Sequence, residues 1–503
     1  MKTNKHVKLP VHQPAVLDRR TFIRRSSAVV MGGIIASTLP VRGMNKKKKR
    51  PRNVLVLMSD QHGPDDIGVF GNRNALTPTL DSLASSGYSL RQSYCQSPVC
   101  VASRNSVLNG CYPHSNGVIS NAFSGNTTLL SFPQVLRQNG YITACFGKLH
   151  TPGREMLDWD VCIEDKVRPV ADLAHNGIVL SGTANLTREP TIGAPDPYPK
   201  TTTFEWLAKE NTIRFMRQHR DRPWLIQCSM YKPHPPFQPP REYWDRIDRS
   251  KLEIPAFPEN DLDDGDPRYV RLMKNRGMWN MPVEQILNGM QGYYGNIAFV
   301  DDMFREVLNV LEHLNLQENT LIIYLADHGE MLHRHGLWTK FVFFDASVRV
   351  PLILSLPGII DTGIESRALV ELVDLFPTIM ELTGCETPAT VQGKSLVPLL
   401  QGKTKHHRNT VHCEYPLTGK NTPGGAYHAT MMLFDGRYKL IDNGPEVSPE
   451  LYDHANDPGE FRNVAADPEQ QQRVGAMLAE VRSWHSHDAV PVQPRVRDVR
   501  QEG

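Results

Sequence analysis

Short apolar runs alternate along this chain with segments in which apolar residues recur every three or four positions. The apolar runs are rich in strand formers, as buried parallel strands are, and four of them stand out, at 53–58, 141–146, 223–230 and 320–326. Segments with apolar residues at helical spacing lie between these runs, at 78–87, 102–108, 131–139, 203–219 and 283–314. Strands that alternate with helices predict an α/β fold with a large, mostly parallel sheet flanked by helices.

Each of the four runs ends at ionisable residues. The ends carry Asp60, Lys148 with His150, Lys232 with His234, and Asp327 with His328. A single polar cluster after a strand is most often a solvated loop. Because the carboxyl ends of parallel strands meet at one edge of a sheet, where α/β proteins bind ligands, four such clusters predict one shared site.

The pattern changes near residue 405. Short strands are predicted at 408–415, 427–434 and 437–441, the last two as a hairpin around Asp435 and Gly436, and a closing helix at 468–485. We therefore predict a catalytic α/β domain at 51–404 and a smaller α+β subdomain with an antiparallel sheet at 405–503. The long segments 151–200 and 240–280 are irregular and proline-containing, and are expected to shape a substrate pocket.

The first 50 residues form a segment of their own. They contain 13 Lys and Arg against one Asp, although the whole chain has a net charge of only +2. The acidic remainder does not indicate a nucleic-acid partner. Asp18 to Arg24 resembles a twin-arginine signal, and the apolar stretch 28–39 suits a signal core but is short for a membrane anchor. The resemblance implies export to the periplasm or medium by the twin-arginine translocase.

The eight cysteines are scattered, with no closely spaced pair of the kind that binds metals. We expect mostly free thiols, with a disulfide through Cys385 or Cys413 left open. Cys100 differs from the other cysteines in its sequence context, because small residues flank it and a helix-like run follows. A helix that begins there would place the sulfur at the positive end of the helix dipole, with Arg104 on the same face. That arrangement suits an anionic substrate; a buried, inert cysteine is the alternative.

The motif Cys-x-Ala-x-Arg at 100–104 resembles the signature of the type I sulfatases, in particular bacterial arylsulfatases and choline-sulfatases. Further matching stretches follow in the family's order over about residues 51–465. The resemblance implies an alkaline phosphatase-like fold and oxidation of Cys100 to formylglycine by a maturing enzyme. It also implies one divalent metal held by Asp60, Gln61, Cys100, Asp327 and His328. The oxygen ligands favour Ca²⁺, and carboxylates can also bind Mg²⁺. The imidazole of His328 would also suit Mn²⁺ or Zn²⁺.

The same resemblance assigns the basic residues. Arg104, Lys148 and Lys340 would hold the sulfate, His150 would contact the formylglycine hydroxyl, and His234 would protonate the leaving group. Lys232 is left open, and His333 and His335 are expected to be structural. The implied activity is hydrolysis of sulfate esters, with a sulfated carbohydrate favoured over a small ester. Two alternatives are a phosphonate monoester or phosphodiester hydrolase of the same fold, and a non-catalytic binding protein.

Overall fold

The computed structural model describes residues 53–122, 128–151, 153–164, 193–258, 261, 274, 280–416, 429–445 and 447–486. The predicted export signal and most of the predicted 151–200 loop lie outside these residues, as does part of the 240–280 segment. Among the helices in the described ranges, none is both long and apolar enough to cross a membrane.

The main sheet has eight strands in the order β4-β3-β5-β1-β6-β7-β2-β8. The first five run parallel, β7 is antiparallel to both of its neighbours, and β8 is parallel to β2. Their bounds are β1 (Asn53–Asp60), β2 (Tyr88–Tyr94), β3 (Ile142–Gly147), β4 (Val161–Ile163), β5 (Trp224–Pro233), β6 (Thr320–Ala326), β7 (Arg349–Ser355) and β8 (Ile364–Glu371). The four predicted apolar runs are β3, β5, β1 and β6, which are consecutive neighbours, so the prediction of a mostly parallel sheet is confirmed.

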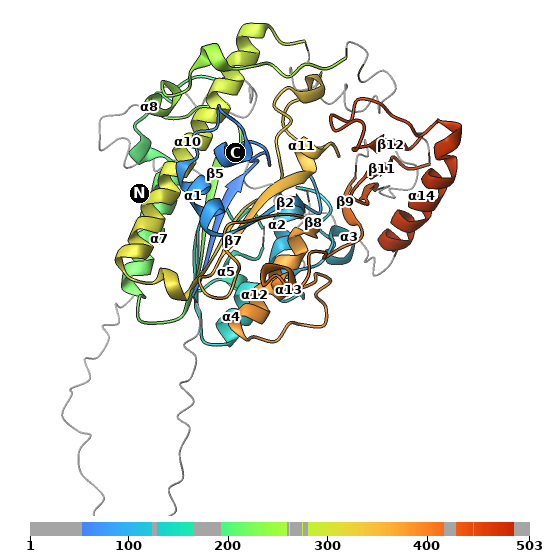
Figure 1. The fold of residues 1–503 in the computed structure, drawn as a ribbon. Helices are drawn as coiled ribbons and strands as arrows, with labels where there is room; N and C mark the ends of the chain where they lie inside the picture. Colours follow the sequence, from blue (N-terminus) through green and yellow to red (C-terminus); the bar gives the residue numbers. More distant parts are fainter. Residues whose placement is uncertain are drawn as a thin grey trace, which may run out of the picture. The chain divides into compact units, whose positions relative to one another are not determined.

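Helices cover both faces of this sheet (Figure 1). They are α1 (Pro78–Ser86), α2 (Cys100–Asn109), α3 (Pro113–Asn116), α4 (Phe132–Gln138), α5 (Glu155–Asp158), α7 (Phe204–Gln218), α8 (Arg241–Trp244), α10 (Val283–His313), α11 (Asp345–Val348), α12 (Leu375–Thr383), α13 (Val397–Leu400) and α14 (Gln471–Ser486). Strand β1 shows why two layers are needed. Val54, Val56 and Met58 join the core shared with α2, α4 and α12, while Leu55 and Leu57 join the core shared with α1, α7 and α10. An apolar run without alternation is buried on both sides.

A second, antiparallel sheet follows, in the order β12-β11-β10-β9. Its strands are β9 (Val411–Tyr415), β10 (Thr430–Phe434), β11 (Tyr438–Asp442) and β12 (Glu450–Asp453). Helix α14 packs on β10 and β11 through a small core of its own. The backbone N–H of Glu414 in β9 donates to the carbonyl of Gln96, 3.0 Å away, so this sheet is bonded to the segment before α2. The boundary at 404/405 stays a prediction.

Four strands of the main sheet and one of the small sheet were not predicted. Strand β4 lies in the segment 151–200 that was expected to be irregular, and β7 is not among the predicted apolar runs. Strand β2 mixes polar and apolar residues, and its pairing is irregular on both sides. Strand β8 lies at the sheet edge with its first half mostly exposed, so its sequence lacks a continuous apolar run. Strand β12, at residues 450–453, is also an edge strand and is only four residues long. Edge strands have few neighbours, and their sequences are correspondingly weak signals.

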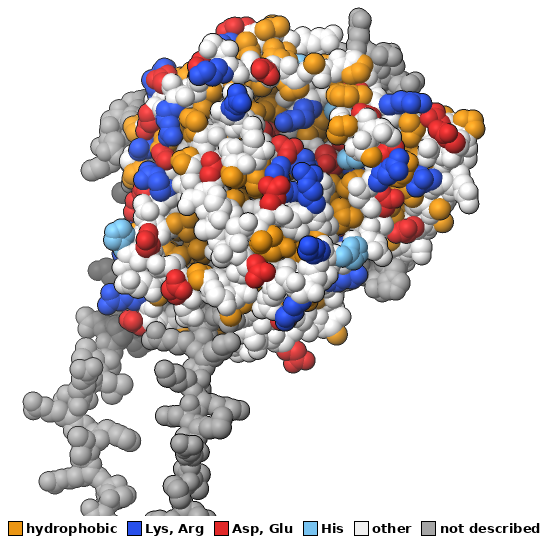
Figure 2. Space-filling view, viewed as in Figure 1, with side chains coloured by type: hydrophobic (Ala, Val, Ile, Leu, Met, Phe, Trp, Pro, Cys, Tyr) orange, Lys and Arg blue, Asp and Glu red, His pale blue; other side chains and the backbone are white. Residues whose placement is uncertain are grey.

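The surface offers little additional stabilisation. Figure 2 shows basic and acidic side chains interspersed on one face of the molecule. Half-exposed ion pairs such as Arg91 with Asp65 and with Glu365 contribute little to stability in water. All eight cysteines are free thiols, so the disulfide left open at Cys385 or Cys413 is not formed. Stability therefore depends chiefly on the apolar layers on the two faces of the main sheet.

Gly147, the last residue of β3, generates a first prediction. Its φ is +90°, and a Cβ added there would lie 2.0 Å from the carbonyl oxygen of Ser229. That same oxygen accepts the backbone N–H of Lys148 at 2.9 Å. We expect Gly147→Ala to lower the free energy of unfolding by about 3 kcal/mol, from backbone strain and overpacking together.

Gly140 provides the matched control. Its φ is +88°, but nothing lies within 4 Å of an added Cβ. Gly140→Ala should therefore cost only the backbone strain, about 1 kcal/mol. Denaturant unfolding of the two variants and the parent measures the difference. Equal losses for both would show that the contact with Ser229 does not constrain this strand end.

Candidate active site

The carboxyl ends of the four adjacent parallel strands converge on one point, as predicted. Asp60 is the last residue of β1, Lys148 follows β3, His234 follows β5, and Asp327 follows β6. Cys100 comes to the same place from the first turn of α2, where it is 1% exposed. Five segments that are distant in sequence thus meet at one edge of the sheet.

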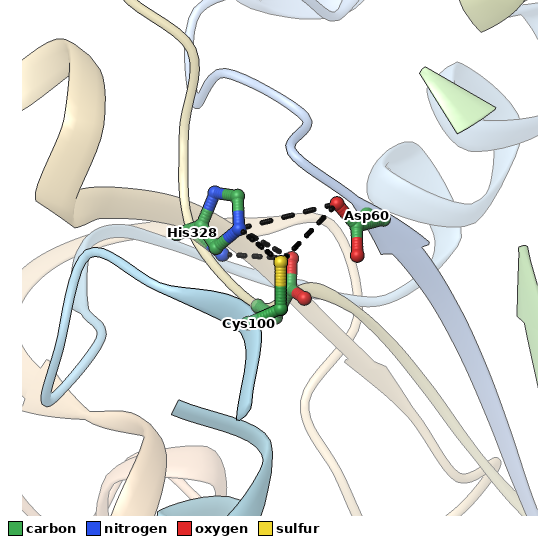
Figure 3. Close-up of side chains that lie close together, drawn as sticks. Asp60, Cys100 and His328 are labelled. Carbon is green, nitrogen blue, oxygen red and sulfur yellow. Dashed lines mark hydrogen bonds and ion pairs between the residues drawn. The ribbon is translucent and has the colours of Figure 1, made fainter. Parts of the chain in front are cut away.

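The Cys100 sulfur is surrounded by ionisable groups (Figure 3). His328 Nε2 lies 3.1 Å from it, Lys340 Nζ 3.3 Å, Lys148 Nζ 3.7 Å and Asp60 Oδ1 3.9 Å. Burial and the Asp60 carboxylate would raise the pKa of the thiol. The cations Lys148, Lys340 and His328 outweigh them and hold the pKa well below its ordinary value. Negative charge at position 100 is therefore strongly favoured.

Arg104, one turn after Cys100, is buried and donates to four partners. Its Nε bonds Asp327 Oδ2 at 2.6 Å and its Nη2 bonds Asp60 Oδ2 at 3.1 Å. Its Nη1 bonds the carbonyl of Lys148 at 2.6 Å and the hydroxyl of Ser229 at 3.0 Å. These partners lie on or next to β6, β1, β3 and β5 respectively, so one side chain links all four strand ends. Both carboxylates also raise the pKa of the guanidinium against the effect of burial, so its charge is permanent.

Asp60, Cys100, Asp327 and His328 form a group whose ligand atoms all lie within 4.8 Å of one another. The His328 ring is oriented for coordination, because its Nδ1 faces the carbonyl of Gly329 at 3.0 Å and its Nε2 faces the site. Burial would raise the pKa of Asp60, but Lys148, His234, Lys340 and Arg104 together lower it well below its usual value. Ionised carboxylates and a directed imidazole are suitable ligands for a divalent cation, so these residues fit the metal implied by the sequence.

Gln61 connects the metal ligands to Lys340. It adopts a φ of +67°, and its backbone N–H donates to Asp327 Oδ1 at 3.1 Å. Its Oε1 accepts from Lys340 Nζ at 2.6 Å, while Lys148 Nζ is ion-paired with Asp60. Both lysine ammonium groups are thereby held within 4 Å of the sulfur, which gives the site fixed positive charge suited to an anionic substrate.

The structure places His234 at the site but does not bring His150 into contact with it. The backbone N–H of His234 donates to the carbonyl of Asp60 at 3.1 Å, and its Nδ1 lies 2.7 Å from the carbonyl of Pro235. Burial, Lys340 and Lys148 lower the pKa of His234 to about 3. His150 is half-buried with a φ of +54°; its N–H donates to Glu164, and its Nδ1 has no hydrogen-bond partner among the described residues.

The other basic residues have structural contacts. Lys232, which the sequence left open, donates from Nζ to the carbonyl of Gln238 at 2.8 Å and so bonds within its own loop. His335 Nδ1 is 2.7 Å from Asp261 Oδ2, and the His333 ring packs against Trp338 with centroids 5.8 Å apart. The structural role expected of His333 and His335 agrees with these contacts.

Glu330 was not identified from the sequence as a site residue. It is buried, its Oε2 accepts from Gln61 Nε2, and its Oε1 accepts from the backbone N–H groups of Leu332 at 2.9 Å and Thr339 at 2.6 Å. It therefore fixes both the orientation of the Gln61 amide and the loop that leads to Lys340. The sequence did offer one signal for Glu330, since it lies three residues after Asp327 in the same polar cluster.

Comparison with known proteins agrees with this geometry. Residues 52–385 match the family model described as Sulfatase, and residues 333–486 match one described as N-sulphoglucosamine sulphohydrolase, C-terminal. The chain is 28% identical over 448 residues to a choline-sulfatase of Rhizobium meliloti (strain 1021), with 83% of each protein covered.

Two solved structures share the fold. A phosphonate monoester hydrolase from Silicibacter pomeroyi superposes with a TM-score of 0.78 at 24% identity, covering 88% of this chain and 99% of its own. A protein solved in complex with its substrate D-glucosamine-2-N,6-O-disulfate superposes with a TM-score of 0.69 at 22% identity, covering 87% and 98%.

The Glu330 contacts yield a second prediction. In Glu330→Gln, an amide NH₂ placed against the Gln61 NH₂ would force one of the two amides to turn. If Gln61 turned, its own NH₂ would face Lys340 Nζ. We expect a loss of about 10- to 100-fold in kcat/KM for a sulfate ester, typical of residues that orient metal ligands, with little change in melting temperature.

Glu450→Gln is the matched control, since Glu450 is equally buried but accepts from Asn443 and Tyr452 in the small sheet. It should leave kcat/KM unchanged. Full activity in Glu330→Gln would contradict the positioning role.

Proposed function

We propose a nucleophile, a set of residue roles and a substrate class for this chain, which belongs to the sulfatase family and is a sulfuric ester hydrolase. The proposed nucleophile is residue 100 after oxidation of Cys100 to formylglycine. The observation that supports this most directly is the position of Cys100, buried at the start of α2 and close to Lys148, Lys340 and His328. Addition of water to the aldehyde would give a hydrate, one hydroxyl of which would be the nucleophile in place of the thiol.

The basic residues would bind the anionic end of the ester. Lys148 and Lys340 lie close to the Cys100 sulfur and would contact the sulfate oxygens, where charge develops as the S–O bond breaks. Arg104 would act mainly by holding Asp60 and Asp327 in place. Those two carboxylates, with Gln61 and His328, would hold one divalent cation, and it would supply Lewis-acid stabilisation of negative charge. The oxygen ligands favour Ca²⁺.

His234 would donate the proton that the leaving oxygen needs. In the absence of an anion its pKa is about 3, because burial, Lys340 and Lys148 all disfavour its charged form. An anionic ester bound between these lysines offsets their charge and raises the pKa, so protonation of His234 is favoured when substrate is present. His150, whose Nδ1 has no hydrogen-bond partner among the described residues, would assist as a base at position 100.

The proposed substrate is a sulfated carbohydrate. The similarity of residues 333–486 to the C-terminal part of N-sulphoglucosamine sulphohydrolase supports a sulfated sugar. A second candidate activity, hydrolysis of phosphonate monoesters, is supported by the superposition on the Silicibacter pomeroyi enzyme and uses the same cationic site.

Two cellular partners follow from the proposal. An oxidising maturation enzyme must act on Cys100, and the twin-arginine translocase would export the folded protein. The export proposal is supported by the sequence Asp18 to Arg24 and by the apolar stretch after it.

The nucleophile and the reaction can be tested together. We expect mass spectrometry of the peptide that carries residue 100, from protein made in its own host, to detect an aldehyde in place of the thiol. The same preparation should hydrolyse sulfate esters, sulfated glucosamine among them, with higher kcat/KM than phenylphosphonate or phosphate diesters. Cys100→Ala should lose activity by several orders of magnitude with an unchanged melting temperature.

The possible results are distinct. Faster turnover of phosphonate monoesters would favour the second candidate. An unmodified thiol in active protein would exclude formylglycine, and an unmodified thiol without turnover of any ester would favour a binding protein.

The role of His234 is tested by the leaving group. A general acid matters most when the leaving oxygen is strongly basic. We expect His234→Ala to lower kcat for an alkyl or sugar sulfate by about 10²- to 10⁴-fold, and for 4-nitrophenyl sulfate by less than about 10-fold. His333→Ala should affect both esters equally and weakly. Equal large losses for both ester classes in His234→Ala would assign His234 to binding instead of proton transfer.

A further inference from the structure

A second cluster of potential metal ligands lies away from Cys100. His114 of α3, Glu414 of β9 and His485 of α14 each offer one ligand atom, and these atoms all lie within 4.8 Å of one another. Figure 1 shows that the three elements lie side by side where the small sheet meets the helices of the main domain. His114 and Glu414 are buried, and His485 is half-buried.

The Glu414 carboxylate has one satisfied and one unsatisfied oxygen. Its Oε1 accepts the backbone N–H of His114 at 2.9 Å and faces His114 Nδ1 at 2.7 Å. Its Oε2 is buried without a hydrogen bond of acceptable geometry among the described residues, although His485 Nε2 is 3.2 Å away. Glu414 is 1% exposed, so Oε2 is an acceptor shielded from water and directed toward His485. A buried carboxylate needs a positive partner, which either a protonated His485 or a metal ion bound between the two residues would supply.

The surroundings are apolar and aromatic. The Trp484 ring stacks on His412 with centroids 4.5 Å apart and meets the rings of Tyr112 and His114 edge-on. His412, two residues before Glu414 and hence on the same side of β9, has its Nδ1 3.5 Å from Glu371 Oε1. Aromatic rings thus cover the His114 and Glu414 side of the cluster, where low exposure strengthens charge interactions, while His485 is partly open to solvent.

We propose that His114, Glu414 and His485 bind a second divalent metal ion, and that this ion is zinc. Two imidazoles and one carboxylate are a ligand set typical of Zn²⁺, whereas Ca²⁺ prefers oxygen ligands alone. Tetrahedral zinc separates its ligand atoms by about 3.4 Å, so atoms now within 4.8 Å need only small side-chain rotations. If Nδ1 of His114 binds the metal, its N–H moves to Nε2, and the ring stays neutral.

The site would act as a structural clamp. Helix α3 packs against α2, which begins at Cys100, while β9 and α14 belong to the C-terminal sheet and its covering helix. A metal bound to residues of α3, β9 and α14 would hold α14 against the part of the chain that carries the proposed nucleophile. Because no such ligand set exists in the unfolded chain, metal binding would favour the folded state.

The alternative is an ion pair between Glu414 and protonated histidines, with no metal. Metal content separates the two. Full-length protein from zinc-supplemented cells, purified without chelators, should contain about one more zinc per chain than His485→Gln, as counted by plasma mass spectrometry. His485→Gln should keep its activity, because His485 contacts no residue of the active site in the described structure. A zinc-selective chelator should lower the melting temperature of the parent but not of His485→Gln.

His454→Gln is the matched control. His454 also lies beside a buried glutamate, Glu460, but there Lys439 already supplies the positive charge to Glu460 and Asp345. This variant should retain the full zinc content. A second measurement needs no variant: crystals of the parent should give an anomalous peak at the zinc edge within bonding distance of Glu414. Equal zinc in parent and His485→Gln, or no anomalous peak beside Glu414, would overturn the proposal.

Discussion

The buried guanidinium of Arg104 is the interaction on which the site depends. Buried between helix α2 and the strand ends, it needs acceptors for its N–H groups, and these are Asp60, Asp327, Ser229 and the carbonyl of Lys148. Each lies on or beside a different strand. The arginine therefore brings the four strand ends to fixed distances from one another, and the cost of burying its charge is offset only when all of them are in place. The relative positions of the metal ligands and Lys148 follow from this single requirement.

Residues that follow a buried strand directly were the easiest to place from the sequence. Asp60, Lys148 and Asp327 were located because the continuous apolar runs before them identify parallel strands, and parallel strands end at one edge. Lys340 depended on resemblance to a known family, as did the roles of Cys100 and Arg104, although the helix-like run after Cys100 had already drawn attention to these two residues. Of the strands that were missed, β2, β8 and β12 have mixed, half-exposed or very short sequences that lack such runs, and β4 is only three residues long.

Contacts made by loops were not predictable. Glu330 acts through Gln61 and through two backbone N–H groups, and no sequence pattern specifies which amide a buried carboxylate will orient. His150 is another case, since neither its φ of +54° nor the bond of its backbone N–H to Glu164 has a signal in the sequence. The cluster of His114, Glu414 and His485 combines residues up to 371 positions apart. Such groupings appear only when the fold is known.

Helix α2 has no exposed residue at any of its ten positions, and its first residue is the cysteine. A small anionic group can enter between two lysines, but the active site of another protein cannot close around a side chain inside a fully enclosed helix. If Cys100 is oxidised as proposed, the oxidising enzyme must reach it before α2 docks against the sheet. Maturation would then be a matter of timing, and newly made chains that fold first would keep an unmodified thiol.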